Sequence, residues 1–485
     1  MVNTTEIIGG KAMKKIFTFI LAMTMVISAA AMSGCSDKSG ADSKNSGAGS
    51  SSSGDKLDLS KADLNGKTVT IASWIDFNNS DDSSAVAAAR RDYFAQMEKE
   101  LNCKLEWKIY DKETLTSQLI TTALANDKFC DIAIPVMWNT ASVLTNKAFV
   151  DLNSIKSVDL TADYYDQNIN DLLDIGGGQR AASCGLLCTP VSETAAVVFN
   201  KRILSECGLE NPYKLHTEGK WTVSKLREMA KKATKDLDGV SGMSINDQYG
   251  ITTLDTVALA QDILAADNVC TITKTRGNNF SYNLNDEKVV NALKYTQDWF
   301  CNDASIFINS NQDAQHEQFS SGKALFYVFQ LSYLEKFKDM KDNYGIVPFP
   351  RGDEAKEYNG LMNWNTSLMG IPSTVSEADR EDIGYVFEAL AYYSRNDNKN
   401  RTDELIGRYV RDDESVEMLN IISSSGVHTP DLIIATPRIE NVYYALNQVI
   451  GGTRDITTDI PKAIASNKNT LRSALNQISA SLASE

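Results

Sequence analysis

The sequence is poor in the residues and motifs that catalysis usually requires. It contains only three histidines, His216, His316 and His428, and their wide spacing does not match that of metal ligands. No G-x-S-x-G motif is present, and the glycine triplet at 176–178 fits neither a Walker loop nor a G-x-G-x-x-G turn. The run DLDG at 236–239 lacks the later ligands of a calcium loop, which favours a solvated turn. We therefore expect a protein that is not an enzyme and that uses neither a cofactor nor a metal ion.

Positive charge and paired cysteines are also scarce. The chain has 48 Lys and Arg against 63 Asp and Glu, a formal net charge of −15. This balance argues against nucleic acid as a partner and against binding an anionic surface by charge alone. Of the eight cysteines, seven lie after Cys35, and an odd number cannot all pair within the chain. We expect mostly free thiols, with one possible bridge between Cys184 and Cys188.

After residue 31 no apolar run is long enough to cross a membrane, and the one before it is short. Met13 and two lysines precede the apolar run 16–31, a pattern typical of a signal peptide, and translation could begin at Met13 instead of Met1. The run is shorter than the roughly 20 residues that span a bilayer. Ser33 and Gly34 before Cys35 resemble a lipobox, although the third position before the cysteine is Met where leucine is usual. We expect a signal peptide over 1–34 and a lipid on Cys35; an ordinary secretory signal is the alternative.

The segment that follows the cysteine has almost no apolar residues between positions 36 and 56. Such a Ser/Gly-rich stretch cannot offset the entropy of ordering and behaves as a flexible coil. We therefore predict a disordered tether over 35–60 that holds a folded domain at the extracytoplasmic face of a cell membrane.

Strands and helices alternate at the start of the folded part. The patterns predict strands at 67–74, 104–110 and 131–137, separated by helices at 83–101 and 115–126. This alternation indicates a parallel sheet with right-handed crossovers. Ligands of such sheets bind beyond the carboxyl ends of the strands.

A second α/β region begins near Pro190. We expect a strand at 195–199, a helix at 201–207 and another helix capped by Thr222, with Trp221 packed against it as a hydrophobic staple. Trp299, inside a helical run, is predicted to belong to the core. The length from about residue 57 onward suits two lobes.

Several aromatic residues fall where a ligand would bind. Trp74 and Trp138 stand at predicted strand ends, Trp364 precedes another predicted strand, and Tyr443 opens a predicted late helix. Trp107 lies inside a predicted strand and is expected to belong to the core. Sugars present C–H faces that stack on such rings, while polar side chains bond their hydroxyls. Together these residues suggest a cleft between two lobes.

Five motifs, in order, resemble those of the extracellular solute-binding proteins of ABC importers, in the carbohydrate-binding branch that includes the maltose-binding protein. They are TPVSETAAVVFNKRILSECGLENP from residue 189, GKWTVSKLREMAKKAT from 219, FSSGKALFYV from 319, YGIVPFPRGDE from 344 and NWNTSLMGIPSTVSEADREDIGYVFEALAYYS from 363. The first resembles an inter-lobe crossing and the last resembles a second crossing with its helix.

The resemblance implies an α/β periplasmic-binding-protein-like fold with two lobes. Each lobe would hold a mixed, mainly parallel sheet flanked by helices, and hinge crossings would join the lobes. The N-terminal lobe would comprise 61–190 and about 360–405, and the C-terminal lobe 191–359 and about 406–485. The protein is expected to be a monomer.

The resemblance also implies a set of ligand-binding residues. Glu193 stands where a relative bonds sugar hydroxyls, and Tyr443 where the family often places a stacking aromatic. The strand from 324 lacks a tryptophan found in some sugar binders, so Gln330 and Tyr333 are the nearest substitutes. The full expected set is Trp74, Asp76, Asn78, Trp138, Asn139, Glu193, Gln330, Tyr333, Trp364 and Tyr443.

These expectations combine into a lipid-anchored receptor that captures a small solute, expected to be an oligosaccharide, and presents it to the permease subunits of an ABC importer. One alternative keeps the fold and binds a polyamine, a peptide or another polar metabolite, with Asp76 and Glu193 as counter-charges. Another, of a different class, is a surface-anchored glycoside hydrolase with two carboxylates across a cleft. A sensor that signals through a partner is not distinguishable from a transport receptor by sequence.

Overall fold

The described part of the chain lies within one of its two compact units, Met1–Asp55 and Lys56–Glu485. The predicted leader, Cys35, Trp364 and Tyr443 lie outside the described residues, as does nearly all of the predicted tether. No helix among the described residues is long and apolar enough to span a bilayer. The computed structural model describes 57–59, 61–175, 178–270, 272–275, 279–283, 286–309, 311–362, 366–427, 458 and 462.

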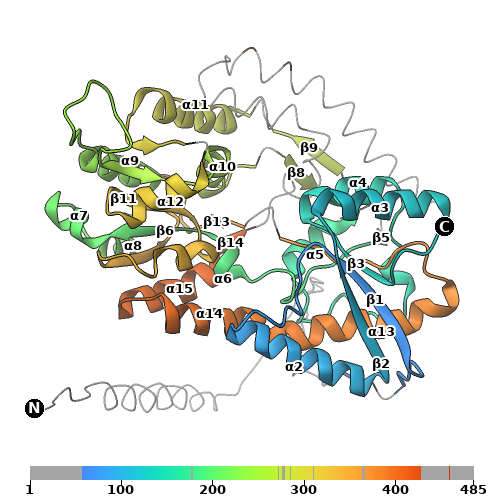
Figure 1. Cartoon of the computed structure of the whole chain (residues 1–485). Helices are drawn as coiled ribbons and strands as arrows, with labels where there is room; N and C mark the ends of the chain where they lie inside the picture. The colour runs from blue at the N-terminus through green and yellow to red at the C-terminus, as the bar shows by residue number, and fades with distance from the viewer. Residues whose placement is uncertain are drawn as a thin grey trace, which may run out of the picture. The chain divides into compact units, whose positions relative to one another are not determined.

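Three parallel strands form the sheet of the first lobe (Figure 1). β1 (Lys67–Ser73) lies between β2 (Cys103–Ile109) and β3 (Ile132–Ile134). Residues 366–372 extend this sheet by isolated antiparallel bridges, which pair Ala133 with Gly370 and Val136 with Ser367. A segment from late in the sequence therefore completes the first lobe.

Helices cover both faces of this sheet. Val69 and Ile71 pack into a core with α2 (Ala85–Glu100) and α13 (Glu377–Tyr393), whereas Ala72 packs into another core with α3 (Lys112–Ala125) and α4 (Thr140–Thr145). The two sets of residues differ because successive side chains of a strand point to opposite faces. Figure 1 shows α2 and α13 on one side of β1, and α3 and α4 on the other.

A five-stranded mixed sheet forms the second lobe. Its order is β10-β7-β11-β6-β12, in which β6 runs antiparallel to both of its neighbours and the other pairings are parallel. β6, the strand that the chain forms on leaving the first lobe, is therefore antiparallel to the other strands of this sheet. The strand bounds are Ala195–Asn200 for β6, Tyr249–Thr252 for β7, Ile306–Phe307 for β10, Ala324–Gln330 for β11 and Tyr344–Pro348 for β12.

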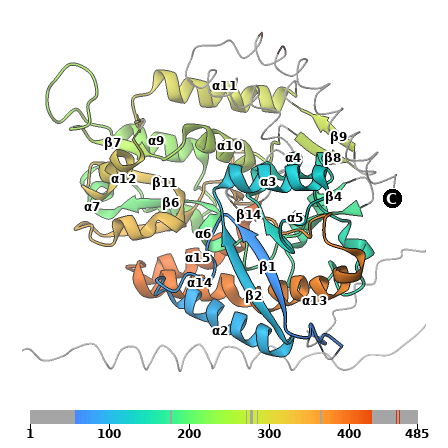
Figure 2. The same ribbon diagram turned by 45° about the vertical axis from the view of Figure 1, so that its right-hand side comes forward.

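The second sheet also has a core on each face. Val197 and Phe199 pack with α9 (Val223–Ala233), α10 (Thr256–Ala266) and α11 (Glu287–Asn302). The alternate side chains Ala196 and Val198 pack with α12 (Gln312–Ser320), η3 (Leu331–Phe337), α14 (Asp397–Arg408) and α15 (Asp413–Ser425). In Figure 2, α9, α10 and α11 lie above the strands and α15 below them.

The remaining elements are short. They are η1 (Met137–Asn139), η2 (Leu152–Ser154), α5 (Gln167–Leu173), β4 (Asp174–Ile175), β5 (Gly178–Gln179), α6 (Pro190–Glu193), α7 (Lys201–Glu206), α8 (Pro212–Thr217), β8 (Ile272–Thr275), β9 (Asn279–Tyr282), β13 (Gly360–Leu361), η4 (Ser394–Asn396) and β14 (Gly426–Val427).

Three chain segments meet where the chain passes between the lobes, and we call this place the crossing junction. Thr194 pairs with Met362, and the Met362 amide donates to the carbonyl of Val427 at 3.0 Å. Glycine is needed here because a Cβ on Gly360 would lie 2.4 Å from Cγ2 of Thr194, and one on Gly426 would lie 2.5 Å from its Oγ1. Any side chain at these glycines would push the segments apart.

Helix α14 ties the first crossing segment to both lobes. The Val191 amide donates to Oδ1 of Asn398 at 3.0 Å, and Nε of Arg401 donates to Oγ of Ser192 at 3.0 Å. At the start of the helix, Asp397 accepts from Nε of Arg90 on α2 at 2.7 Å. Its side chain is 1% exposed, and burial raises the pKa of this carboxyl while Arg90 opposes the shift. The carboxylate of this ion pair is therefore buried.

Several local predictions are confirmed. Thr222 caps α9 by accepting from the Lys225 amide, and Trp221 is fully buried, with Nε1 donating to the Pro348 carbonyl at 2.9 Å. Trp299 is fully buried as well. The strand predicted over 131–137 is shorter, because Pro135 has no amide for a ladder bond and η1 begins at Met137.

Cys184 and Cys188 are both free thiols in the structure, so the possible bridge between them is not formed. Both of these thiols are buried, and burial raises the pKa of Cys184 to about 11. Such thiols are poor nucleophiles at neutral pH.

Replacing Asp397 with alanine should destabilise the protein strongly, because the Arg90 charge would be left buried without its partner. Removing one member of a buried ion pair costs about 3 kcal/mol or more. The matched control is Asp403→Ala on the same helix, where the exposed pair with Lys399 at 2.7 Å should be worth less than about 1 kcal/mol. Urea unfolding measures both changes, and equal losses would contradict a structural role for the buried pair.

Acid should weaken the second lobe through His316, whose ring lies 5.2 Å from that of Tyr333 and 5.7 Å from that of Tyr327. Burial, aided by Lys336 and opposed by Asp313, lowers the pKa of His316 to about 4. The unfolded chain has a histidine pKa of about 6.5, so as the pH falls it takes up the proton before the folded protein does.

The contribution of the neutral ring is therefore complete above pH of about 6.5 and is lost as the pH falls toward about 4. His316→Gln should show a shallower fall in unfolding free energy between neutral pH and mild acid than the unchanged protein. Parallel pH profiles for the two proteins would contradict this assignment.

Candidate functional site

Two of the predicted tryptophans lie together at the carboxyl end of the first sheet. Trp74 directly follows β1, and its Nε1 donates to Oγ of Ser367 at 2.9 Å. Trp138 lies in η1, just past β3. Between them is Lys112, whose Nζ is 4.3 Å from the ring centroid of Trp74 and 4.8 Å from that of Trp138. Two indole faces and one ammonium thus share a single place.

Lys112 was not among the residues predicted from sequence. It is the first residue of α3, after the N-cap Asp111. Burial lowers the pKa of its ammonium, although the carboxylates of Asp111 and Glu113 act in the opposite direction. Nothing in the local sequence shows that this lysine meets two tryptophans, which come from loops 38 and 26 positions away.

The other predicted residues of the first lobe divide by exposure. Asp76 and Asn78 are exposed in the loop after β1, where Oδ1 of Asp76 accepts from the Asn78 amide at 3.0 Å. Asn139 is 5% exposed, and its side-chain nitrogen donates to Oγ1 of Thr116 at 2.9 Å. Asn139 therefore fastens η1 to α3 and positions the neighbouring Trp138.

The second lobe contributes Glu193, Gln330 and Tyr333. Burial is the main cause that raises the pKa of Tyr333, and the charge of Glu193 adds to it, so the phenol lies near that carboxylate. Gln330 ends β11 opposite Ala195 and is 5% exposed. Its Oε1 is buried without a hydrogen-bond partner, and the same is true of Oγ1 of Thr194. A buried unpaired acceptor is costly, and Oε1 of Gln330, at the end of β11, is a place where a ligand hydroxyl could donate, whereas Oγ1 of Thr194 is enclosed by the crossing segments.

The predicted residues of the first lobe and those of the second lobe are both connected to the crossing junction. Trp74 bonds Ser367, which lies five residues after Met362, and Met362 pairs with Thr194. Glu193 and Thr194 belong to the first crossing, and Gln330 pairs with the residue that follows them. The predicted residues of the two lobes are therefore joined through the same two crossing segments. Trp364 and Tyr443 lie outside the described residues.

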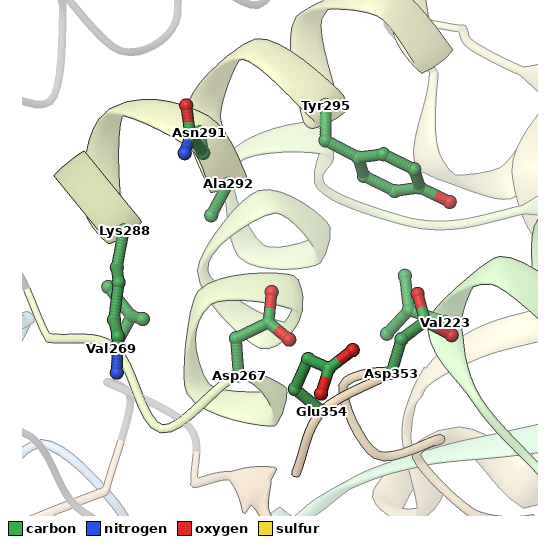
Figure 3. Close-up of a pocket in the computed structure, with 9 residues that line it drawn as sticks. All are labelled: Val223, Asp267, Val269, Lys288, Asn291, Ala292, Tyr295, Asp353 and Glu354. Atoms are coloured by element: carbon green, nitrogen blue, oxygen red, sulfur yellow. The ribbon is translucent and has the colours of Figure 1, made fainter.

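A separate cavity of ≈ 440 Å³ lies in the second lobe, and none of the residues that line it was predicted from sequence. Figure 3 shows Lys288, Asn291, Ala292 and Tyr295 on one helix, α11, facing Asp267 and the pair Asp353 and Glu354. Val223 and Val269 complete its lining. Burial, with the charge of Asp353 second, raises the pKa of Asp267. Nothing in the sequence indicates this cavity, because its residues come from four separate segments.

Three carboxylates converge in the loop predicted to be a solvated turn. Oxygens of Asp236, Asp238 and Asp247 all lie within 4.8 Å of one another. They also bond their own loop: Asp247 accepts from the amides of Leu237 and Ser244, at 2.7 Å in each case. These bonds lower the pKa of Asp247 and close the turn.

Solved structures show the same fold. A cyclo/maltodextrin-binding protein complexed with maltotetraose has a TM-score of 0.59 at 16% identity, over 83% of this chain and 97% of that one. The GacH receptor of Streptomyces glaucescens, solved unliganded and with acarbose, has a TM-score of 0.55 at 17% identity, over 85% and 99%. An ABC transporter solute-binding protein of Agrobacterium radiobacter in complex with ribitol has a TM-score of 0.54 at 17% identity, over 84% and 100%.

At these identities the likeness concerns the fold, and it confirms the predicted two-lobed α/β architecture. No curated protein matches the sequence. A family model described as bacterial extracellular solute-binding protein matches residues 80–399, which is more than half of the chain. The chain belongs to the family of bacterial extracellular solute-binding proteins.

Proposed function

We propose that this protein is a lipid-anchored receptor that binds an oligosaccharide between its lobes and delivers it to an ABC importer. The observation that carries the proposal is the pair Trp74 and Trp138, which stand at the carboxyl ends of the first sheet and are fastened to the crossing segments. Ligands of open α/β sheets bind at that edge.

The chemistry of both groups of residues suits a sugar. Indole faces attract the C–H faces of a pyranose ring. The unpaired Oε1 of Gln330 accepts a hydroxyl proton, and the phenol of Tyr333 and the carboxylate of Glu193 add polar partners. The structural relatives found with maltotetraose and ribitol support a polyhydroxylated ligand.

Closure about the crossing junction would bury such a ligand. A solute that contacts both lobes binds the closed form better than the open one and so shifts the population toward it. The closed form is then the one that the permease subunits would recognise. The anchor in this proposal is the lipid on Cys35, followed by the tether over 35–60.

The position of Lys112 weighs against a cationic ligand. A polyamine that entered between Trp74 and Trp138 would have to displace an ammonium that both rings already contact. We therefore rank polyamines below saccharides, and retain peptides and other polar metabolites as outcomes of the test.

A thermal-shift screen tests the proposal. Mono- and oligosaccharides, amino acids, peptides and polyamines are each added to the protein, because a ligand of the folded state must raise the melting temperature by mass action. We expect a shift with one family of glycans. A shift with peptides or polyamines and none with glycans would overturn the proposed ligand.

Trp74→Ala and Trp138→Ala should each weaken binding of that glycan about tenfold, since one stacked ring is worth roughly 1 to 1.5 kcal/mol. Calorimetric titration gives the affinity, and the melting temperature shows whether each variant is folded. Leu124→Ala is the matched control, because Leu124 lies on α3 and is 73% exposed. If both tryptophan variants fold and keep full affinity, the two rings do not belong to the site.

A further inference from the structure

Lys112 occupies the place where a stacking ligand would approach the two tryptophans. Its Nζ lies over both indole rings, at 4.3 Å and 4.8 Å from their centroids. The lysine comes from the first turn of α3, whereas the rings come from the loop after β1 and from η1. Three separate segments of the first lobe thus bring one ammonium onto a surface built of aromatic rings.

The ammonium is held there at a cost in hydration. Lys112 is half-buried, and its burial disfavours the charged form. Each indole face offsets part of this cost through the attraction between a cation and the ring quadrupole. A ligand that stacks on these rings displaces the ammonium from them. The ligand must then offer the ammonium new interactions that compensate for the lost contacts.

Ligands differ in the interactions that they can offer to the displaced ammonium. A neutral sugar offers hydroxyl oxygens, and a hydrogen bond from the ammonium to a hydroxyl lacks the attraction of an opposite charge. A carboxylate on the sugar ring offers that charge, and such bonds are roughly twice as strong as neutral ones. A second cation is repelled.

The negative charge of the whole protein does not cancel this preference. The formal net charge is −15, but at physiological ionic strength charges more than about 8 Å apart are largely screened. Asp111 and Glu113 flank Lys112, and their charges favour its charged form, which keeps the ammonium positive despite its burial. Both carboxylates also accept hydrogen bonds of their own: Asp111 from two amides of its own helix, and Glu113 from Asn139 at 3.4 Å.

We propose that Lys112 makes the site selective for acidic saccharides, such as oligosaccharides of uronic acids, over neutral saccharides of the same size. This inference rests on the proposed function and names the substrate class of the same site. Lys112 is then the residue that sets specificity, while Trp74 and Trp138 supply stacking that any pyranose can use.

The test compares each acid with its own neutral form. Trisaccharides of galacturonate, glucuronate and mannuronate, each beside its methyl ester, and a set of neutral oligosaccharides are titrated into the full-length protein at physiological salt. We expect one acid to bind about tenfold tighter than its ester, since a charge-assisted bond exceeds a neutral one by roughly 1.4 kcal/mol.

Variants assign the preference to the lysine. Lys112→Met should bind the acid and its ester with equal affinity, and Lys112→Arg should keep most of the preference. The matched control is Lys108→Met, which removes one positive charge from β2 of the same lobe, where the lysine is paired with Glu106 at 3.4 Å. That variant should keep the full preference.

The outcomes separate this inference from the proposed function. Neutral glycans or esters that bind as well as every acid would overturn the acidic preference and leave the sugar receptor intact. A preference that survives in Lys112→Met would overturn the role of the lysine. Binding of no saccharide at all, with binding of another ligand class, would overturn both.

Discussion

The close packing of three chain segments at Thr194 is the constraint on which the rest of the structure depends. At Gly360 and Gly426 the segments approach so closely that a Cβ at either position would overlap Thr194. Because the segments lie side by side, they carry residues from both lobes toward one place. Helix α14 then holds the first segment through side-chain bonds from Asn398 and Arg401.

Each lobe has a closely packed apolar interior, and polar side chains gather where its strands end. The interiors are filled by large side chains such as Trp221 and Trp299, which have no exposed surface. At the strand ends the structure keeps half-buried aromatics and unpaired oxygens, which cost stability and suit a ligand better than a core. A receptor needs this separation, because a binding surface must stay open until a solute arrives while the lobes keep their shape.

The sequence was informative about local structure and less so about contacts between distant segments. The strand ending before Trp74 and the Thr222 cap follow from patterns within a few residues, and so do the tryptophans at strand ends. Lys112 was missed because its significance comes from two loops far away in sequence, and the pairing of Arg90 with Asp397 joins residues 307 positions apart. The cavity beside α11 was missed for the same reason.

Amide hydrogen exchange, measured with and without a saturating oligosaccharide found in the screen, tests directly whether the binding site lies between the lobes. We predict slower exchange in both lobes at once, in the loop after Trp74 and around Gln330, together with the first crossing segment at 190–194. The helix α9, remote from the junction, should exchange unchanged. Protection confined to one lobe, or centred on the cavity between Asp267 and Tyr295, would contradict a site formed between the lobes.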